Sequence, residues 1–222
     1  MKHSPDETDW NTFWELSASK RFGKVSWSKR RIMRVLRPHL ASARKALDAG
    51  CGSGFFAAHF CDNDLETAAV DYAPEALNMA RTATGGRAQV AKADLIGDDL
   101  AQAVGADFDI VFSDGLFEHF SPSQQDKIMA NFIKVLADDG VIVTFVPNRW
   151  SPWEWIRPFY MPGIEEKPFD LKGLVDLNER NGLRVLARGG VNTLPFRLSP
   201  EGGVARVFGM LLYTVASKEK EQ

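Results

Sequence analysis

The sequence predicts an α/β fold built on a seven-stranded, mostly parallel, doubly wound sheet with a C-terminal antiparallel hairpin strand. Segments with strand and helix patterns alternate through the fifth strand, which is typical of parallel strands joined by right-handed helical crossovers. Residues 141–146 are apolar except for Thr144, as expected of a strand covered on both faces. No convincing helix separates the last two predicted strands, which favours an antiparallel pair at the end of the sheet.

Composition indicates one soluble domain of ordinary make-up. The chain has 222 residues, of which 45% are hydrophobic and 25% charged, and its formal net charge is -2. A binder of nucleic acid would usually be basic, so this class is not favoured. Two cysteines, an N-terminus without an apolar signal core and no apolar run long enough to cross a bilayer predict a cytoplasmic protein.

The N-terminal part predicts two helices. The first covers residues 9–18, where aromatic and aliphatic side chains recur at helical spacing. The second begins after Ser26 or Ser28 and runs to about Arg37, since Pro38 ends a helix or closely follows its end.

A basic run overlaps this second helix. Residues 17–46 hold ten lysines and arginines and no acid. We interpret the run as a solvated helix face. The alternative is a surface for an anionic acceptor, such as a phosphorylated compound, a carrier-bound intermediate, an anionic lipid or RNA.

The next segments alternate regularly. Strands are expected at 45–49, 65–71 and 88–93, helices at 54–61 and 74–84, and a short acidic loop or helix at 97–104. The fourth strand covers 108–113. The helix after it begins with Ser121 as its cap, Pro122 at its first position and Gln124 completing a capping box.

The C-terminal third is less regular. Residues 138–140 stop the preceding helix, and the fifth strand covers 141–146. An aromatic and proline-rich insertion follows at 147–168. Asp170 is expected to cap a helix closed by Gly182, and the last strands are expected at 183–187 and 207–216.

A glycine-rich loop joins the first strand to its helix. Asp48 ends the strand, and Gly50, Gly52 and Gly54 follow at alternate positions. A missing Cβ permits positive φ and lets a ligand press on the backbone. The dinucleotide fingerprint would need glycine or alanine where the chain has Phe55, and an acid beside the loop disfavours a pyrophosphate.

Two further acids end the next two strands. Asp71 lies about twenty residues after the loop, where a carboxylate can accept both hydroxyls of a ribose. Asp94 ends the third strand, where an acid can accept an adenine amino group, and Leu95 adds backbone and an apolar contact. The loop and the two acids together predict a nucleoside site.

These segments resemble the class I S-adenosylmethionine-dependent methyltransferases, in the small-molecule (type 11/25-like) branch. The matching segments are 47–54 for motif I, 70–71 for motif II, 93–95 for motif III, 109–120 after strand four and 136–141 before strand five. The resemblance implies a Rossmann-like sheet, S-adenosylmethionine as the cofactor and S-adenosylhomocysteine as the product.

The resemblance also implies roles for single residues. Asp48 would order the loop and the cofactor's amino group, Asp71 would hold the ribose and Asp94 the base. Tyr72 would pack on the adenine and Ser113 would contact the methionine end. The cofactor-binding set is completed by Gly50, Cys51, Gly52, Gly54 and Leu95.

The segment after strand four departs from one subgroup. Residues 113–116 read Ser-Asp-Gly-Leu, whereas methyltransferases of nucleic-acid bases carry an Asn/Asp-Pro-Pro-Tyr type of motif there. This difference favours O-, N-, S- or C-methylation of a small acceptor.

Methyl transfer from a sulfonium depends mainly on alignment, and a base is needed only when the acceptor must lose a proton. His119 is the candidate base; the alternative is that it packs at the helix start. The expected acceptor pocket comprises Phe22, Glu118, Trp150, Trp153 and Tyr160. The sequence shows no cluster of His, Cys and acids at ligand spacing, so no metal is predicted.

The chain is thus interpreted as one methyltransferase domain in four parts: a helical lid at 1–44, the cofactor core at 45–146, the insertion at 147–169 and a C-terminal part at 170–222. The expected partner is a small-molecule acceptor. One alternative is a methyltransferase that acts on RNA or a carrier-bound anionic substrate through the basic run. Another is a domain that binds S-adenosylmethionine without catalysis. The acceptor, the methylated atom and the oligomeric state do not follow from the sequence.

Overall fold

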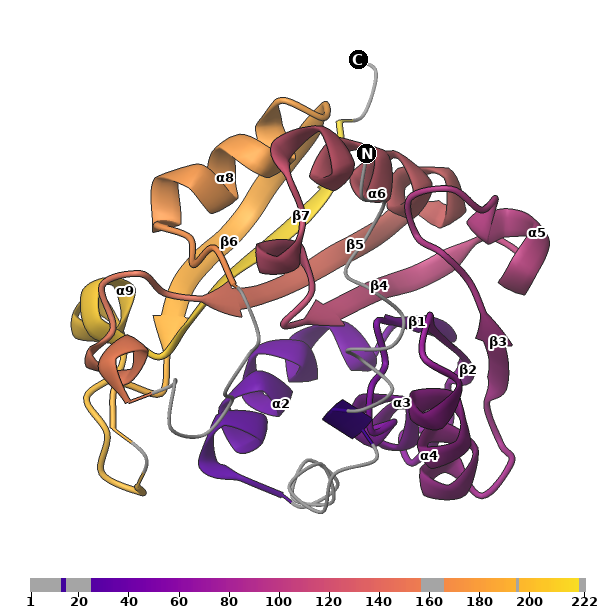
Figure 1. The fold of residues 1–222 in the computed structure, drawn as a ribbon, viewed down its shortest axis with the longest axis horizontal. Helices are drawn as coiled ribbons and strands as arrows, with labels where there is room; N and C mark the ends of the chain where they lie inside the picture. The colour runs from indigo at the N-terminus through magenta and orange to yellow at the C-terminus, as the bar shows by residue number, and fades with distance from the viewer. Residues whose placement is uncertain (1–12, 15–24, 157–165, 195, 220–222) are drawn as a thin grey trace.

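The computed structural model describes residues 13–14, 25–156, 166–194 and 196–219, and a seven-stranded sheet forms its centre (Figure 1). The strand order is β3-β2-β1-β4-β5-β7-β6. Strands β1 to β5 pair in parallel, and β7 pairs antiparallel with both β5 and β6. The predicted fold class is confirmed. The strands are β1 (Lys45–Ala49), β2 (Glu66–Asp71), β3 (Gln89–Lys92), β4 (Phe108–Asp114), β5 (Leu136–Pro147), β6 (Leu183–Val191) and β7 (Leu211–Lys218).

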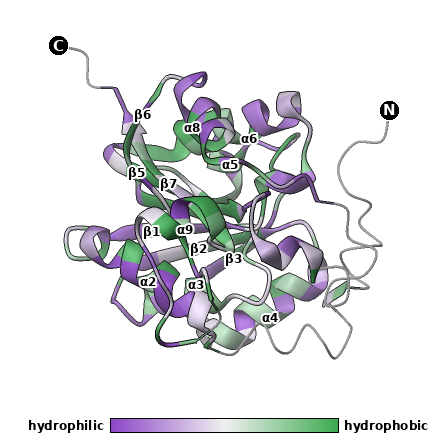
Figure 2. Ribbon diagram, turned by 90° about the vertical axis from the view of Figure 1, so that its left-hand side faces the viewer, coloured by the Kyte–Doolittle hydropathy of each residue, from purple (hydrophilic) through white to green (hydrophobic). Residues whose placement is uncertain are grey.

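Helices cover both faces of the sheet, as a doubly wound fold requires (Figure 1). One face carries α2 (Trp27–Leu40), α3 (Phe55–Cys61) and α4 (Pro74–Thr84), and the other carries α5 (Leu100–Val104), α6 (Pro122–Val135) and α8 (Leu171–Glu179). In Figure 2 the hydrophobic residues (green) lie mainly on the central strands, between the two helical layers. On the α2 side, Phe60 packs edge-on against Phe112 at 5.8 Å between ring centroids. On the α6 side, Phe117 packs likewise against Phe132.

Caps begin three helices where the sequence predicts them. Ser26 accepts a hydrogen bond from the Lys29 backbone N–H at 3.2 Å at the start of α2. At the start of α6, the Gln124 side chain accepts from the Ser121 N–H at 2.9 Å. Asp170 accepts from the Gly173 N–H at 2.7 Å and so caps α8. These local signals predict helix starts well because each satisfies a backbone N–H that the helix leaves unpaired.

Four predicted boundaries are wrong. Strand β6 runs to Val191 rather than to 187. Helix α2 continues through Pro38 to Leu40, since a proline near the end of a helix removes only one hydrogen bond. Strand β5 starts at Leu136, which pairs with Phe108 before a register shift. Strand β7 starts at Leu211 rather than 207, because the preceding residues belong to a helix.

That helix, α9 (Gly203–Phe208), contradicts the expectation of no helix between the last two strands. It is short, and it packs closely on β6. A Cβ built at Gly190 would lie 1.8 Å from the Ala205 carbonyl oxygen, so only glycine lets the two backbones approach. The antiparallel pairing of β6 with β7 is nevertheless as predicted.

The N-terminal helix at 9–18 lies outside the described residues except for Phe13 and Trp14. In the insertion, the structure describes a short 3-10 helix, η3 (Pro152–Trp155). A bridge between Asn148 and Phe169 closes the insertion at its base. None of the helices in the described part of the chain is long and apolar enough to cross a membrane.

Candidate active site

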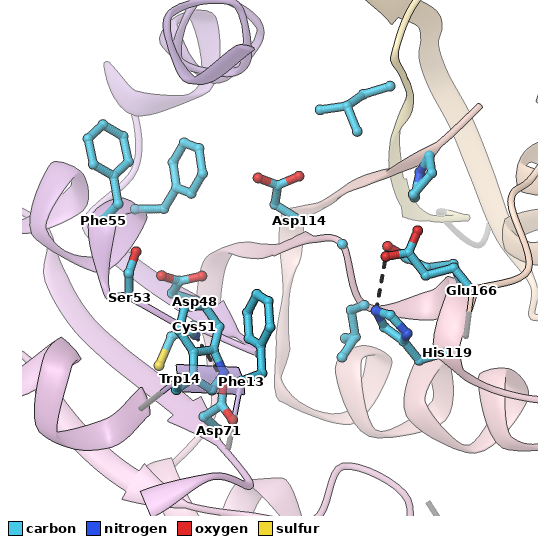
Figure 3. A pocket seen from close by; sticks show the side chains of 18 of the residues that line it. Phe13, Trp14, Asp48, Cys51, Ser53, Phe55, Asp71, Asp114, His119 and Glu166 are labelled. Atoms are coloured by element: carbon cyan, nitrogen blue, oxygen red, sulfur yellow. Dashed lines mark hydrogen bonds and ion pairs between the residues drawn. The ribbon is translucent and has the colours of Figure 1, made fainter. Parts of the chain in front are cut away.

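A cavity of about 460 Å³ lies at the carboxyl ends of the central strands (Figure 3). Its floor includes residues that end or follow β1, β2, β4 and β5, with Asp48, Asp71, Asp114 and Pro147 among them. Ligands of open α/β sheets bind in this position, and the volume is in the range of small-molecule sites. The cavity has two regions that differ in construction.

The first, here called the glycine-loop region, comprises residues 48–54 with Asp71 and Asp94. Gly50, Gly52 and Gly54 have φ of 70°, 48° and 70°, which side chains other than glycine rarely adopt. A Cβ built at Gly54 would lie 2.4 Å from the Ala80 Cα, so this glycine also sets the packing of α3 on α4. The loop backbone is therefore fixed against α4 behind it, and on the other side the Trp14 ring packs against Gly52.

Backbone donors hold the two strand-end acids of this region. One carboxylate oxygen of Asp71 accepts from the Gly52 N–H at 2.9 Å, and the other accepts from the Ala73 N–H at 3.0 Å. Burial raises the pKa of Asp71, and these hydrogen bonds oppose the rise. Asp94 accepts from the Ile96 N–H at 3.0 Å. Both acids line the cavity, as do Cys51, Tyr72 and Leu95.

A small buried charge network lies beside the loop. Asp48 is 3% exposed and accepts from the Ala57 N–H at 2.8 Å. Burial raises its pKa to about 7, and Asp114 adds to the rise. Burial raises the pKa of Asp114 to about 6, against the effect of Lys29. Burial lowers the pKa of Lys29 to about 8, against the pull of the two carboxylates.

The position of Lys29 shows that the interpretation of the basic run as a solvated helix face is wrong in part. Lys29 and Arg31 belong to the basic run, yet both are buried, so the run is not simply a solvated face. Arg31 pairs with Glu201 at 2.5 Å, and the Lys29 ammonium lies 4.0 Å from the Phe55 ring centroid and lines the cavity. Helical periodicity placed both residues on the helix but did not show which side of it would be covered.

Two predicted site residues do not reach the cavity. Ser113 is fully buried and pairs with Thr144, on the face of the sheet covered by α5, α6 and α8. Successive strand residues point to opposite faces, so its neighbour Asp114 lines the cavity instead. Trp150 is 62% exposed and does not line the cavity. Phe22 and Tyr160 lie outside the described residues.

The second region, here called the carboxylate region, comprises Glu118, His119, Glu154 and Glu166. All four line the cavity, together with Trp153 from the expected acceptor pocket. Glu118 and His119 belong to the 3-10 helix η2 (Phe117–His119), and Glu154 to η3. The Lys167 N–H donates to the Glu118 carbonyl at 2.8 Å, which fixes the segment of Glu166 beside η2.

Glu118 is the most deeply buried acid of this region, with a side chain 2% exposed. Burial raises its pKa well above the usual range, and Glu166, Asp114 and Glu154 add to the rise. Its Oε1 lies 3.8 Å from His119 Nε2. The sequence analysis predicted Glu118 and His119 at the site but not Glu154 and Glu166. An insertion has no periodic pattern that would show which of its side chains lie at the cavity.

Residues 46–140 match the family model described as "Methyltransferase domain". Residues 46–140 of the chain therefore resemble a methyltransferase domain. The match starts in β1 and includes the glycine loop, Asp71, Asp94 and the η2 segment, which are the segments that carry the resemblance in the sequence. No curated protein matches the chain.

Solved structures of methyltransferases share this fold. The N-methyltransferase NodS from Bradyrhizobium japonicum, in complex with S-adenosylhomocysteine, has a TM-score of 0.68 at 16% identity, covering 96% of this chain and 98% of that one. The magnesium protoporphyrin IX methyltransferase from Synechocystis, with S-adenosylhomocysteine bound, has a TM-score of 0.67 at 12% identity, covering 96% and 100%. A TehB-like methyltransferase from Corynebacterium glutamicum has a TM-score of 0.64 at 20% identity, covering 96% and 98%. These structures confirm the predicted fold, and the family-model match supports the predicted methyltransferase class.

Proposed function

We propose that this methyltransferase transfers the methyl group of S-adenosylmethionine to a small molecule or biosynthetic intermediate. The observation that carries the proposal is the convergence of the glycine loop, Asp71 and Asp94 on one cavity. S-adenosylmethionine supplies a methyl group on a sulfonium, which is already a good leaving group. The protein's work is therefore to hold donor and acceptor in line and to exclude water.

The glycine-loop region has a place for each part of the nucleoside. The Asp71 carboxylate oxygens accept hydrogen bonds from backbone N–H groups, among them those of Gly52 and Ala73, and keep lone pairs for ribose hydroxyls. Tyr72 offers a ring to the adenine, while Asp94 and Leu95 line the same side. The Trp14 ring lies over Gly52, where it covers the loop as part of the proposed lid.

The buried charges suit the amino-acid part of the cofactor. Asp48 and Asp114 supply negative charge for an ammonium and a sulfonium, and either cation would favour their ionised forms. The Lys29 ammonium has no hydrogen-bond partner among the described residues and supplies positive charge for a carboxylate. A zwitterionic ligand with an added sulfonium fits this set better than a polyphosphate does.

The acceptor side is built by η2 and the insertion. Trp153 gives it an aromatic wall, and Glu118 and His119 supply polar groups. His119 is the proposed base for an acceptor that must lose a proton, since a neutral imidazole has a nitrogen that can accept one.

A small acceptor fits the surface better than RNA does. Among the described residues of the basic run, Lys29 and Arg31 are buried, which leaves Arg30, Arg34 and Arg37 as exposed cations on α2. Three arginines on one helix are few phosphate contacts for a nucleic-acid site. A cytoplasmic location remains a prediction.

Thermal unfolding with and without ligand tests the cofactor. S-adenosylhomocysteine at about 100 times its Kd should stabilise the fold by about 2.7 kcal/mol, or about 5–10 °C in Tm. NAD at the same concentration should give no shift. A shift with NAD and none with S-adenosylhomocysteine would overturn the proposal. Transfer of a labelled methyl group across a panel of acceptors would separate an enzyme from a domain that only binds the cofactor.

A further inference from the structure

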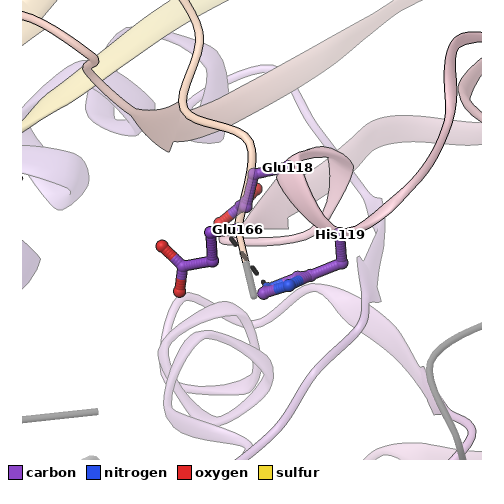
Figure 4. A group of neighbouring side chains, drawn as sticks. All are labelled: Glu118, His119 and Glu166. Atoms are coloured by element: carbon purple, nitrogen blue, oxygen red, sulfur yellow. Dashed lines mark ion pairs between the residues drawn. The ribbon is translucent and has the colours of Figure 1, made fainter. Parts of the chain in front are cut away.

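Three side chains of the carboxylate region lie close together although they are not all close in the sequence. One ligand atom each from Glu118, His119 and Glu166 lies within 4.8 Å of the other two (Figure 4). Glu166 is far from the other two in the chain, and the hydrogen bond from Lys167 to Glu118 brings it back to them. The premise that the chain has no cluster of His and acids at ligand spacing is therefore wrong.

Glu118 supplies an independent observation. Its side chain is 98% buried and lines the cavity, and its Oε2 accepts no hydrogen bond from the residues that the structure describes. The ionic contact that the described residues give it is His119 at 3.8 Å. A buried carboxylate oxygen without a partner is costly, and a bound cation is a standard way to satisfy it.

We propose that Glu118, His119 and Glu166 form a binding site for one divalent metal ion on the acceptor wall of the cavity. Two carboxylate oxygens and one imidazole nitrogen make a mixed set with open positions for water or a ligand. Imidazole suits Mn²⁺, Fe²⁺, Co²⁺ or Zn²⁺ better than Mg²⁺ or Ca²⁺, which prefer oxygen alone. The site is assigned to a first-row transition ion.

The geometry is close to what such an ion needs. Ligand bonds of about 2.1 Å place neighbouring donors about 3 Å apart and opposite donors about 4.2 Å apart. The Glu118–His119 separation of 3.8 Å lies between these values. The outer limit of 4.8 Å exceeds the larger by less than 1 Å, which small side-chain rotations can close. Glu154 lies on the same wall, where it can accept hydrogen bonds from a bound water.

The position suggests what the ion does, and this part rests on the proposed function. A divalent ion on the acceptor wall would hold an acceptor oxygen and lower the pKa of its hydroxyl. With the ion bound, His119 would be a ligand rather than the base proposed above, and the acceptor's proton would leave to water. An acceptor with a hydroxyl, or with two neighbouring oxygens, therefore fits the site better than an aliphatic amine does.

Metal binding is tested without the cofactor, so its result is separate from that of the proposed function. The full chain is treated with EDTA, desalted and titrated with Mn²⁺ alone, and free Mn²⁺ is followed by electron paramagnetic resonance. One bound Mn²⁺ per chain is expected. Glu118→Gln should weaken binding by more than about 100-fold, since loss of a residue that merely supports a ligand costs about 10- to 100-fold. Glu166→Gln should weaken it in the same direction.

Glu179→Gln is the matched control, because Glu179 is exposed on α8 and remote from the cavity. It should bind Mn²⁺ as the native chain does. Absence of saturable binding up to about 1 mM Mn²⁺, weaker than most protein metal sites, would overturn the site. So would equal binding by the Glu118→Gln and Glu179→Gln variants. The thermal shift with S-adenosylhomocysteine, measured on the same samples, shows whether each variant keeps the folded cavity.

Discussion

In the glycine-loop region the acids accept hydrogen bonds from nearby backbone N–H groups, whereas in the carboxylate region the acids mainly face one another and a histidine. Asp48 and Asp71 are bonded to backbone of the loop, of α3 and of the start of α4. Within the described part of the chain, one oxygen of Glu118, Oε2, accepts no hydrogen bond. The first region is thus complete as folded, and the second gains most from what binds to it.

The two regions also differ in how the chain builds them. The glycine-loop region comes from successive strand ends, so its parts follow one another at regular intervals. The carboxylate region joins η2 to two points of the insertion after β5. Rigid strand ends suit a cofactor that many enzymes share, and loops suit an acceptor that differs between them.

The largest expected effect breaks the packing of the glycine-loop region. Gly54→Ala places a Cβ 2.4 Å from the Ala80 Cα at a φ of 70°. Overpacking and the left-handed conformation together should cost about 2–5 kcal/mol of unfolding free energy. Gly85→Ala is the control, because Gly85 has φ +61° and no atom within 4 Å of the built Cβ. It should cost only about 1–2 kcal/mol. Equal losses in urea unfolding would show that the contact with α4 does not matter.

The second effect is on the cofactor. Asp71→Ala removes the acceptor proposed for the ribose and a hydrogen bond to the loop. The variant should lose about 2–3 kcal/mol of binding free energy for S-adenosylhomocysteine, which calorimetry would measure as a Kd about 30- to 150-fold higher. Asp138→Ala removes a fully exposed aspartate and should leave Kd unchanged. If His119→Ala weakened binding as much as Asp71→Ala does, the division between the two regions would fail.

The third effect is a pH dependence. The pKa of Asp48 is raised to about 7, so its carboxyl is mostly neutral at pH 6 and ionises as the pH rises. A cationic ligand favours the ionised form. Binding of S-adenosylmethionine should therefore tighten about fivefold between about pH 6 and 7 if only the ionised form binds. Asp48→Asn should flatten this profile; a native profile that is already flat would remove Asp48 from contact with the cation.

The contrast explains what the sequence could predict. Asp48, Asp71 and Asp94 were predicted because strand ends of a parallel sheet meet at one edge, so spacing along the chain becomes proximity in space. Ser113 was misplaced by one residue, and alternation along β4 turns such an error into the opposite face of the sheet. Only the geometry showed Asp114 as the cavity residue.

The carboxylate region could be predicted only in part. Glu118 and His119 follow β4 directly, so their place near the strand end was visible. Glu166 lies beside η2 because the backbone N–H of Lys167 bonds to the Glu118 carbonyl, and no periodic pattern in the sequence predicts this contact. Lys29 was misread for a related reason, since burial of one side of α2 depends on what covers it.

The smallest expected effect is on the Tm of the protein without ligand. The change in Tm should be positive for a variant of the carboxylate region and negative for a variant of the glycine-loop region. The pKa of Glu118 is raised in the folded protein, so the folded state binds more protons than the unfolded chain does. Its ionisation at higher pH therefore costs stability, which returns as the pH falls. Glu118→Gln should raise the Tm of the metal-free protein at about pH 8 and reduce its dependence on pH. In the glycine-loop region, Asp71→Asn should lower the Tm although the pKa of Asp71 is also raised, because the carboxamide NH2 would face a backbone N–H from which the carboxylate accepts a hydrogen bond. A lower Tm for Glu118→Gln in metal-free buffer would mean that the carboxylate already has a stabilising partner, and the two regions would then be held in the same way.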